Sequence, residues 1–400
     1  MKVIRVIGLM LIVLLLSACS SSQEESLEEK KPATISVYVY SPAKSIITRG
    51  DIGDVSSPDP DEAKKESLIT KLQIWVFNHD TGDRIAYYSP ESVENLNNGS
   101  GDTYQLSVSE AFSQADPKPK VDVYVAANVT SASCGLSFDE TTTKTTRSQL
   151  EAAQIGTGYF GLSTMKEQAP ADGFPMSAVL HGATVTGSAP VFRIPTLSLV
   201  RTVSKIRFVF SREKGVKDVK INSITLNGEM IPEYEYLFLG SGETATLPYH
   251  VGSTYVVDAK DFLGGRPLTE ICENDDPLAY TYQAGQDAQE YEKLIYKAIN
   301  HKDEDGITSK PLLTAKGPYY LRESDKKLIG TISYQIAGET AGQWEDKDPV
   351  TFEMHGAGDF SRNHTWIVYA YYSVSGLVAV TVVLENWIEN TTSPHEVHNW

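Results

Sequence analysis

Residues 33–40, ATISVYVY, decide the fold class of this chain. Ile35, Val37 and Val39 fall on one face of an extended strand, and the polar and tyrosine side chains between them fall on the other. An alternation with a period of two is typical of a strand with one buried face. The sequence also holds 21 tyrosines and is rich in Thr, Val and Ile, so strands are favoured over helices throughout.

The segment before this strand has the features of a lipoprotein signal. Basic residues at the start precede the apolar run Val6–Leu16, which is too short to form a permanent membrane span. The run ends in Leu16-Ser17-Ala18-Cys19, the pattern of a bacterial lipobox, in which the cysteine is lipidated and becomes the new N-terminus. Residues 20–31 are polar and charged, as expected of a solvated tether. No Asp follows Cys19, so the tether carries no inner-membrane retention signal and an outer-membrane, surface location is expected.

The segment after the strand is a loop that contains an isolated arginine. Residues 41–62 hold several Pro and Gly residues, and their only basic side chains are Lys44 and Arg49. Exposed loops of this composition are the usual sites of proteolytic cutting. Arg49 is therefore a candidate processing site, and Lys44 is the alternative for a protease that cuts after lysine.

The rest of the chain alternates between apolar strands and turns. Strands are expected at residues 68–77, 84–88, 121–128, 196–210, 218–226, 328–337, 364–375 and 377–388, and short helices at 147–153 and 286–299. The segment 196–210 has the pattern of a long strand that bends between two sheets. The spacing of these strands predicts a mainly β protein of two β-sandwich domains with a few short helices. We expect the boundary near Pro195–Leu199.

Composition and motifs exclude several classes of function. A net charge of −17 disfavours nucleic acid as a partner. Neither Cys134 and Cys272 nor the acidic segment 54–62 has the spacing of a metal site, and His395-Glu396-Val397-His398 is better explained as part of a polar tail. No nucleophile motif or phosphate loop appears, so no enzyme activity, cofactor or metal is predicted.

Several segments, in the order in which they occur, resemble those of FimA-type major fimbrillins, the subunits of lipoprotein-derived (type V) pili. Each is a short stretch of strand or strand end: residues 33–37 (ATISV), 71–78 (KLQIWVFN), 123–128 (VYVAAN), 174–177 (FPMS), 199–206 (LVRTVSKI), 319–323 (YYLRE) and 362–366 (RNHTW), together with the terminal Trp400. Ser204 stands where the family usually has Ala. The resemblance implies a transthyretin-like, two-domain fimbrillin fold. Residues 225–315 contain no matching motif.

The resemblance also implies a mechanism of assembly. An Arg-specific, trypsin-like protease cuts after Arg49, the first strand leaves with Ile35, Val37 and Val39, and a neighbouring subunit fills the groove with a C-terminal strand. The partners implied are other fimbrillin subunits in a homopolymer, the anchor and tip subunits of the pilus, the protease, and the outer membrane before trimming.

Two segments are candidates for the donor strand. One is Leu377–Ile388, where Val378, Val380, Val382 and Leu384 share a face and the other face is also apolar. This segment is equally well explained as the last central strand of its own domain, and Asn390–Trp400 is the second candidate.

We therefore expect five segments: a signal peptide at 1–18, a lipidated tether at 19–32, a removable strand and cleavage loop at 33–49, and two β-sandwich domains at 50–196 and 197–400. The predicted function is that of a structural subunit of surface fimbriae that supports adhesion. Two alternatives stay open. The chain is an anchor or tip subunit of the same pilus, or it is a glycan-binding surface lipoprotein that uses Trp344, Trp366, Trp387 or Trp400 as platforms.

Overall fold

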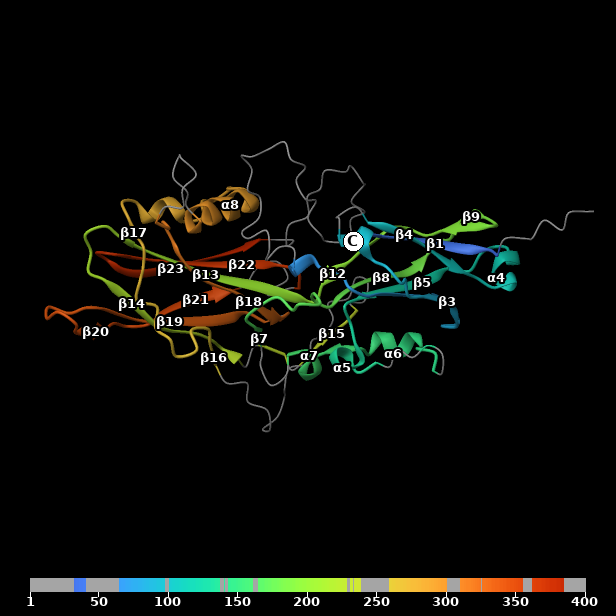
Figure 1. Cartoon of the computed structure of the whole chain (residues 1–400), viewed down its shortest axis with the longest axis horizontal. Helices are drawn as coiled ribbons and strands as arrows, with labels where there is room; N and C mark the ends of the chain where they lie inside the picture. The colour runs from blue at the N-terminus through green and yellow to red at the C-terminus, as the bar shows by residue number, and fades with distance from the viewer. Residues whose placement is uncertain are drawn as a thin grey trace, which may run out of the picture.

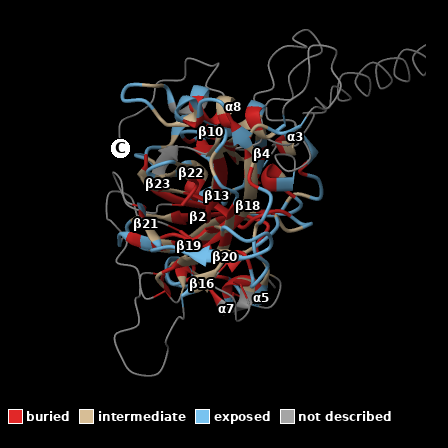
Figure 2. Cartoon of the chain, turned by 90° about the vertical axis from the view of Figure 1, so that its left-hand side faces the viewer, coloured by how far each residue is buried: buried red, intermediate tan, exposed pale blue. Residues whose placement is uncertain are grey.

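The computed structural model consists mainly of β-strands arranged in two groups along the long axis of the molecule (Figure 1). It describes residues 32–40, 65–97, 101–136, 140, 143–160, 165–228, 231–232, 234–238, 259–300, 310–324, 326–354 and 362–384. Buried residues form an apolar core within each group of strands, and seen end-on the buried residues lie in the middle of the molecule with exposed ones around them (Figure 2). The mainly β, sandwich-type fold predicted from the sequence is confirmed.

The first group of strands forms two five-stranded sheets around one apolar core. Sheet 1 has the order β11-β1-β10-β9, with β4 on the other edge of β1: β11 (Leu197–Ser198), β1 (Thr34–Tyr40), β10 (Val191–Arg193), β9 (Thr186–Ser188) and β4 (Asp102–Ser107). Sheet 2 has the order β12-β8-β5-β2-β3: β12 (Val200–Arg201), β8 (Met176–Ala183), β5 (Val121–Ala127), β2 (Leu72–Asn78) and β3 (Arg84–Tyr88). The strand predicted at 33–40 thus lies inside a sheet rather than at its edge.

The second group forms a six-stranded and a five-stranded sheet around a second core. Sheet 3 contains β23 (Gly376–Leu384), β22 (Thr365–Ser373), β13 (Val203–Glu213), β18 (Thr314–Arg322), β7 (Met165–Lys166) and β17 (Glu273–Asn274). Sheet 4 contains β16 (Lys260–Asp261), β14 (Val219–Leu226), β19 (Leu328–Ala337), β20 (Trp344–Asp346) and β21 (Val350–Met354). The two apolar cores agree with two sandwiches, while the predicted residue limits of the domains stay a prediction.

Helices cover the outer faces of sheets 2 and 3. α5 (Ser131–Cys134), α6 (Arg147–Glu151), α7 (Thr157–Phe160) and the ribbon of β6 (Gln154–Ile155) and β15 (Glu235–Tyr236) lie beside sheet 2 (Figure 1). α8 (Ala288–Ile299) lies beside sheet 3 (Figure 1), as does the 3-10 turn η2 (Pro277–Tyr280), whose Pro277 O accepts from Tyr369 OH of β22. α3 (Glu94–Asn97) and α4 (Glu110–Gln114) come before and after β4 in the sequence. Because helices cover their outer faces, β5 and most of β13 are buried on both sides. None of the helices in the described ranges is long and apolar enough to cross a bilayer.

Two predicted strands differ from the observed ones for identifiable reasons. The strand expected at 68–77 begins only at Leu72, because the N–H groups of Ile69 and Thr70 bond to the side chains of Asn97 and Asn128 instead of a neighbouring strand. The long strand expected at 196–210 is three strands in three sheets, namely β11, β12 and β13. Its backbone changes partners on the way, since the N–H of Leu199 donates to Tyr40 and the N–H of Thr202 donates to Pro175.

Candidate functional site

β1 is inserted between strands on both of its edges. It runs antiparallel to β4 from Thr34 to Val39, and on its other edge it runs parallel to β10 and then to β11. Its ends are also bonded, since Thr34 N–H donates to Pro190 O at 2.8 Å and Leu199 N–H donates to Tyr40 O at 2.9 Å. Removing β1 would therefore leave unpaired edges on both sides of a gap one strand wide.

The side chains predicted to fill a groove are the ones that the fold buries most completely. Ile35, Val37 and Val39 are each 0 % exposed and belong to the core between sheets 1 and 2. Across the ladder, Ile35 is opposite Leu106 and Phe192, and Val37 is opposite Tyr104. Burying an aliphatic side chain of this size contributes about 1.5–3 kcal/mol. The three together thus stabilise the seated strand by roughly 5–9 kcal/mol as an upper estimate.

The opposite face of β1 is polar and bonded to β4. Thr34 Oγ1 donates to Gln105 Oε1 at 2.9 Å, and Gln105 Nε2 donates to Ser36 Oγ at 3.1 Å. At the end of the strand, Gly101 has φ +71°, and a Cβ there would lie 2.6 Å from the Tyr38 hydroxyl oxygen. Only glycine fits this position without displacing β1.

Asn128, the end of the VYVAAN segment, fixes two neighbouring segments of chain. It has φ +57° and is 6 % exposed. Its side chain accepts from Thr70 N–H at 2.8 Å and donates to Leu68 O at 2.7 Å and Phe174 O at 2.9 Å. The asparagine therefore joins the start of β2 to the FPMS segment that leads into β8.

The motifs at 199–206, 319–323 and 362–366 meet in a buried ionic cluster between the two groups of sheets. Lys205 Nζ lies 3.1 Å from Glu66 Oε2, and Tyr320 OH donates to Glu66 Oε1 at 2.6 Å. Arg201 donates to Glu66 O at 2.9 Å and to Asn363 Oδ1 at 3.1 Å. Burial by itself raises the pKa of Glu66, but Lys205, Tyr320 and Arg201 outweigh it, so this pKa lies below its ordinary value.

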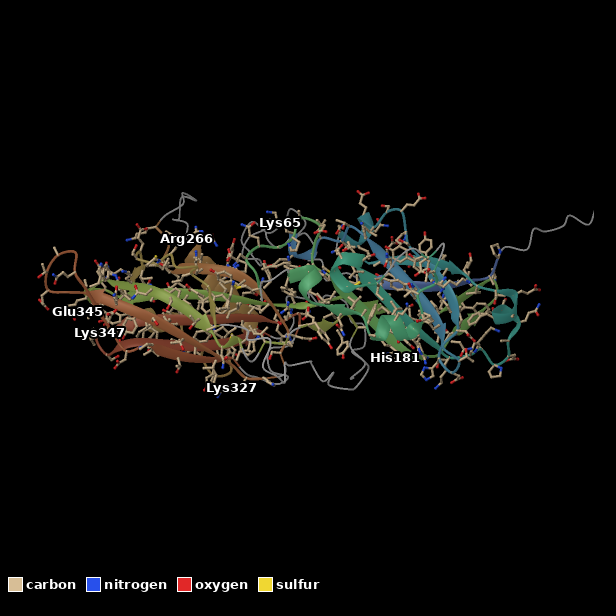
Figure 3. All side chains as sticks on the ribbon, turned by 90° about the horizontal axis from the view of Figure 1, so that it is seen from below. Lys65, His181, Arg266, Lys327, Glu345 and Lys347 are labelled. Carbon is tan, nitrogen blue, oxygen red and sulfur yellow. The ribbon has the colours of Figure 1, made fainter. Side chains whose placement is uncertain are left out.

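No periodic pattern or motif marks Glu66 in the sequence. It follows Lys65, the first described residue after the predicted cleavage loop, and Lys65 lies near the middle of the long axis (Figure 3). The chain that would remain after a cut at Arg49 is therefore held at the junction of the two groups of sheets by Glu66.

A second buried ionic group lies beside the first. Arg362 Nε donates to Glu323 Oε2 at 2.9 Å, and Arg362 NH1 donates to Leu237 O at 3.1 Å. Glu235 is 0 % exposed and accepts from Glu323 N–H at 3.0 Å. Burial, followed by the charge of Glu323, raises the pKa of Glu235 to about 8, so this carboxyl is protonated at neutral pH.

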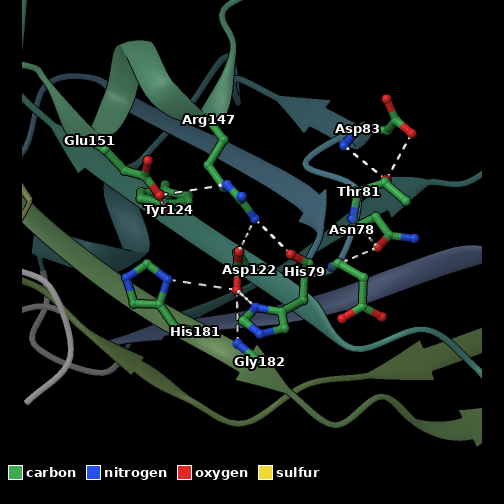
Figure 4. Close-up of polar contacts among 11 residues, drawn as sticks. Asn78, His79, Thr81, Asp83, Asp122, Tyr124, Arg147, Glu151, His181 and Gly182 are labelled. Atoms are coloured by element: carbon green, nitrogen blue, oxygen red, sulfur yellow. Dashed lines mark hydrogen bonds and ion pairs between the residues drawn. The ribbon is translucent and has the colours of Figure 1, made fainter.

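Asp122 on β5 is the centre of a polar cluster that the sequence did not indicate (Figure 4). Its carboxylate lies 2.7 Å from His79 Nδ1 and accepts from Arg147 NH1 at 2.9 Å and Gly182 N–H at 2.8 Å. Burial by itself raises the pKa of Asp122. The hydrogen bonds from Gly182, His79 and Arg147 outweigh this effect, so the pKa lies below its ordinary value. The cluster ties α6 and the turn after β2 to sheet 2. Within the described ranges, no group of three or more His, Cys, Asp or Glu residues could hold a metal ion.

Other predicted site residues lie outside the described part of the chain. These are the lipidation site Cys19, the processing site Arg49 and the alternative donor Asn390–Trp400. The other candidate donor is placed in part. β23 pairs with β22 along its whole length in sheet 3, but among the described strands it lies at the edge of this sheet and not at its centre, as a last central strand would.

The candidate donor face is exposed where it can be described. Val378 is 38 % exposed, whereas its neighbour Leu377 is 8 % exposed and packs in the core. The side chains of Val380, Val382 and Leu384 lie outside the described part, although the backbone ladder pairs these residues with Tyr369, Ile367 and Thr365.

The tryptophans give little support to a glycan-binding surface. Trp366 is 1 % exposed within the core of the second group of sheets, so it cannot serve as a platform. Trp344 is half-buried with the Lys220 ammonium 5.5 Å from its ring centre. Trp387 and Trp400 lie outside the described residues.

Comparison with known proteins identifies the family of the first half of the chain. Residues 27–202 match the model of the FimA major fimbrial subunit protein family. This range includes β1, the predicted cleavage loop and sheets 1 and 2 up to β12. The resemblance to fimbrial subunits drawn from the sequence motifs is thus confirmed over residues 27–202. No curated protein matches the chain.

Three solved structures to which the chain is similar are from Parabacteroides distasonis and Porphyromonas gingivalis. A candidate cell adhesion protein from Parabacteroides distasonis ATCC 8503 has 14% identity and a TM-score of 0.49, covering 90% of this chain and 99% of that one. The tip fimbrial protein Mfa3 of Porphyromonas gingivalis has 11% identity and a TM-score of 0.43, covering 88% and 98%. A fimbrial assembly protein from Parabacteroides distasonis ATCC 8503 has 14% identity and a TM-score of 0.40, covering 88% and 98%. Likeness at this level assigns no function to the chain.

Proposed function

We propose that this chain, which matches the FimA family over residues 27–202, is a structural subunit of surface fimbriae that polymerises by donor-strand exchange. It is exported as a lipoprotein acylated at Cys19, reaches the outer membrane, and is cut after Arg49 by an Arg-specific protease. β1 then leaves, and a C-terminal strand of another subunit takes its place. The mature chain supports adhesion as part of a fimbrium with anchor and tip subunits.

The observation that supports this proposal most directly is the setting of β1. The strand is paired on both edges and contributes three fully buried side chains, yet it precedes the rest of the domain in sequence. A single cut between Tyr40 and Lys65 would make it a separate peptide. When β1 leaves, it exposes the unpaired edges of its neighbouring strands and the apolar core beneath it. Strand addition requires both, since main-chain hydrogen bonds give affinity and alternate side chains fill pockets.

Electrostatics oppose assembly, so the inserted strand must supply the affinity. Residues 1–49 hold six Lys/Arg and four Asp/Glu, a charge of +2, so the chain from Gly50 onward carries a formal net charge of −19, against −17 for the full sequence. Like-charged subunits repel each other weakly at physiological salt. A strand that fills the empty groove regains roughly 5–9 kcal/mol from the burial of its apolar side chains, which is large enough to outweigh this repulsion.

The experiment that tests this function replaces the processing arginine. Arg49→Ala should keep β1 seated and abolish the ladder of denaturant-resistant oligomers, and a deletion from Leu377 to the end should abolish it by removing the donor. Arg266→Ala is a matched control, because Arg266 is an exposed arginine in a turn of the second group of sheets (Figure 3). The Arg266→Ala protein should form the same ladder of denaturant-resistant oligomers as the parent. Undiminished polymerisation of Arg49→Ala, with no cut at Lys44 or another basic residue nearby, would refute the proposal.

A further measurement separates the shaft subunit from the anchor and tip subunits. An anchor subunit would retain its lipid and remain uncut at Arg49 in cells, and a tip subunit would accept a donor strand without offering one. N-terminal sequencing of the mature protein from cells distinguishes a shaft subunit from an anchor, because a shaft subunit should begin at Gly50, and polymerisation of the purified cut protein with itself distinguishes a shaft subunit from a tip.

A further inference from the structure

The end of sheet 1 leads directly into the centre of sheet 3. Strands β11, β12 and β13 follow one another with only Leu199 and Thr202 between them. The segment 197–213 thus passes through three sheets without a loop that could absorb a displacement. A shift at its first residues is therefore carried toward β13, which pairs with β18 on one side and β22 on the other.

β1 holds the first part of this segment in place. Val39 pairs with Leu197 and Tyr40 with Ser198, and Leu199 N–H donates to Tyr40 O at 2.9 Å. Among the described strands, β11 pairs in its sheet with β1 only. When β1 leaves, the backbone of β11 loses its ladder while the residues after it stay bonded.

Arg201 connects this segment to the start of the last hairpin. It is 2 % exposed, and its NH1 donates to Asn363 Oδ1 at 3.1 Å. Asn363, in turn, has φ +60° and donates its N–H to Val203 O at 2.8 Å. Because both side chains are buried, water cannot replace a bond that is pulled apart, and the buried guanidinium would be left under-paired.

Asn363 stands two residues before β22, and β22 pairs with β23 from Thr365↔Leu384 to Ser373↔Gly376. β23 is the outermost strand of sheet 3 in the described part of the chain, and it carries one of the two candidate donor segments. The path from the removable strand to this hairpin is therefore short: Tyr40 is hydrogen-bonded to Leu199, Arg201 follows Leu199 two residues later, and Arg201 is hydrogen-bonded to Asn363.

We propose that residues 197–203 couple the occupancy of the β1 position to the pairing of β22 with β23, so that emptying the groove loosens the last hairpin of the same subunit. This coupling rests on the proposed function and adds a regulation to it. In the uncut chain the groove is filled and the hairpin is closed, so the subunit neither accepts nor offers a strand. After the cut, the subunit becomes able to accept a strand in its groove and to offer its own C-terminal strand at the same time.

Hydrogen exchange measures this coupling. The parent chain is cut with an Arg-specific protease, the monomeric fraction is isolated, and backbone amide exchange is compared with that of Arg49→Ala treated in the same way. Exchange in 102–107 reports on whether the groove has emptied, and exchange in 365–384 reports on the hairpin. We expect both to rise about tenfold or more after cutting, while 328–337 in sheet 4 stays within about twofold.

Adding back β1 tests the reverse direction. A synthetic peptide of residues 33–49 should restore slow exchange in 102–107 and also in 365–384, although the peptide touches only the groove. If cutting accelerates 102–107 but leaves 365–384 unchanged, the coupling is wrong and the proposed function stands. If 102–107 is unchanged, β1 does not leave, and the proposed function fails together with the coupling.

One substitution tests the route through Arg201. Asn363→Gly removes the amide that accepts from Arg201 while tolerating the left-handed backbone. Cutting should accelerate amide exchange in 365–384 about tenfold in the parent but leave it about unchanged in this variant. Asn300→Gly, at the exposed end of α8, is the matched control and should keep the full effect. A full effect in Asn363→Gly would overturn the route, and the peptide experiment decides the question if this variant does not fold.

Discussion

Val37→Ala tests whether β1 is a separable part of the first core. Val37 is 0 % exposed at the centre of the strand, opposite Tyr104 in the ladder. The substitution removes two carbon atoms, a transfer loss of about 1.6 kcal/mol at 0.8 kcal/mol per methylene. A residual cavity adds to this loss, so the free energy of unfolding should fall by about 2–3 kcal/mol.

The assay is urea unfolding of the cut and uncut forms. In an Arg49→Ala background the strand stays attached, and the full loss caused by Val37→Ala should appear. With Arg49 intact, cutting removes the mutated strand, so the trimmed Val37→Ala protein and the trimmed parent should unfold at the same urea concentration. Ser36→Ala is the control on the other face of the strand. It loses only the bond from Gln105, worth about 0.5–1.5 kcal/mol.

Two results would refute this reasoning. A loss below about 0.5 kcal/mol in the uncut form would mean that β1 is not held by its apolar face. An equal loss in the cut and uncut forms would mean that the cut strand stays in its groove, and polymerisation by strand replacement would then require an additional step to expel it.

Three further predictions concern other parts of the chain. Cys19→Ala should leave unprocessed precursor and abolish labelling by a fatty-acid analogue; undiminished labelling would exclude lipidation at this residue. Asn128→Ala should lower the free energy of unfolding by about 3 kcal/mol or more, because it removes the bonds to Thr70, Leu68 and Phe174 and strains a backbone at φ +57°. Asn128→Gly should cost about 1 kcal/mol less, and equal losses would argue against strain. Because the pKa of Glu235 is raised to about 8, the folded state binds a proton that the unfolded state releases, so stability falls as pH rises from about 4.5 to about 8. Glu235→Gln should therefore unfold like the parent near pH 4.5 and become progressively more stable than the parent toward pH 8, whereas a constant difference across this range would contradict a buried, protonated Glu235.

Much of the secondary structure could be predicted because it depends on local patterns. The strands 84–88 and 328–337 were predicted with the bounds that the structure has, since turns and apolar alternation mark both ends. The helix expected at 286–299 is observed at Ala288–Ile299, after Asp287 caps its first turn. The last two strands were expected to join at Gly376, and they form a hairpin there.

Predictions failed where a backbone group bonds to a distant side chain. Asn97 and Asn128 take the N–H groups of Ile69 and Thr70, so the second strand starts late. No window of sequence contains this information, because each asparagine lies tens of residues from the backbone that it contacts. The same holds for Glu66, whose partners Lys205 and Tyr320 come from the second half of the chain.

The sequence alone determined that the chain is a β protein, that residues 33–40 form a strand with one apolar face, and that its motifs resemble those of fimbrial subunits. These properties follow from side-chain periodicity and composition, which act over a few neighbouring residues. Only the tertiary structure decided that β1 is paired on both edges and that the separate motifs around Arg201, Tyr320 and Asn363 meet at one buried junction with Glu66. Pairing partners and buried ionic contacts depend on which distant segments the packing of two cores brings together, and no local pattern specifies that choice.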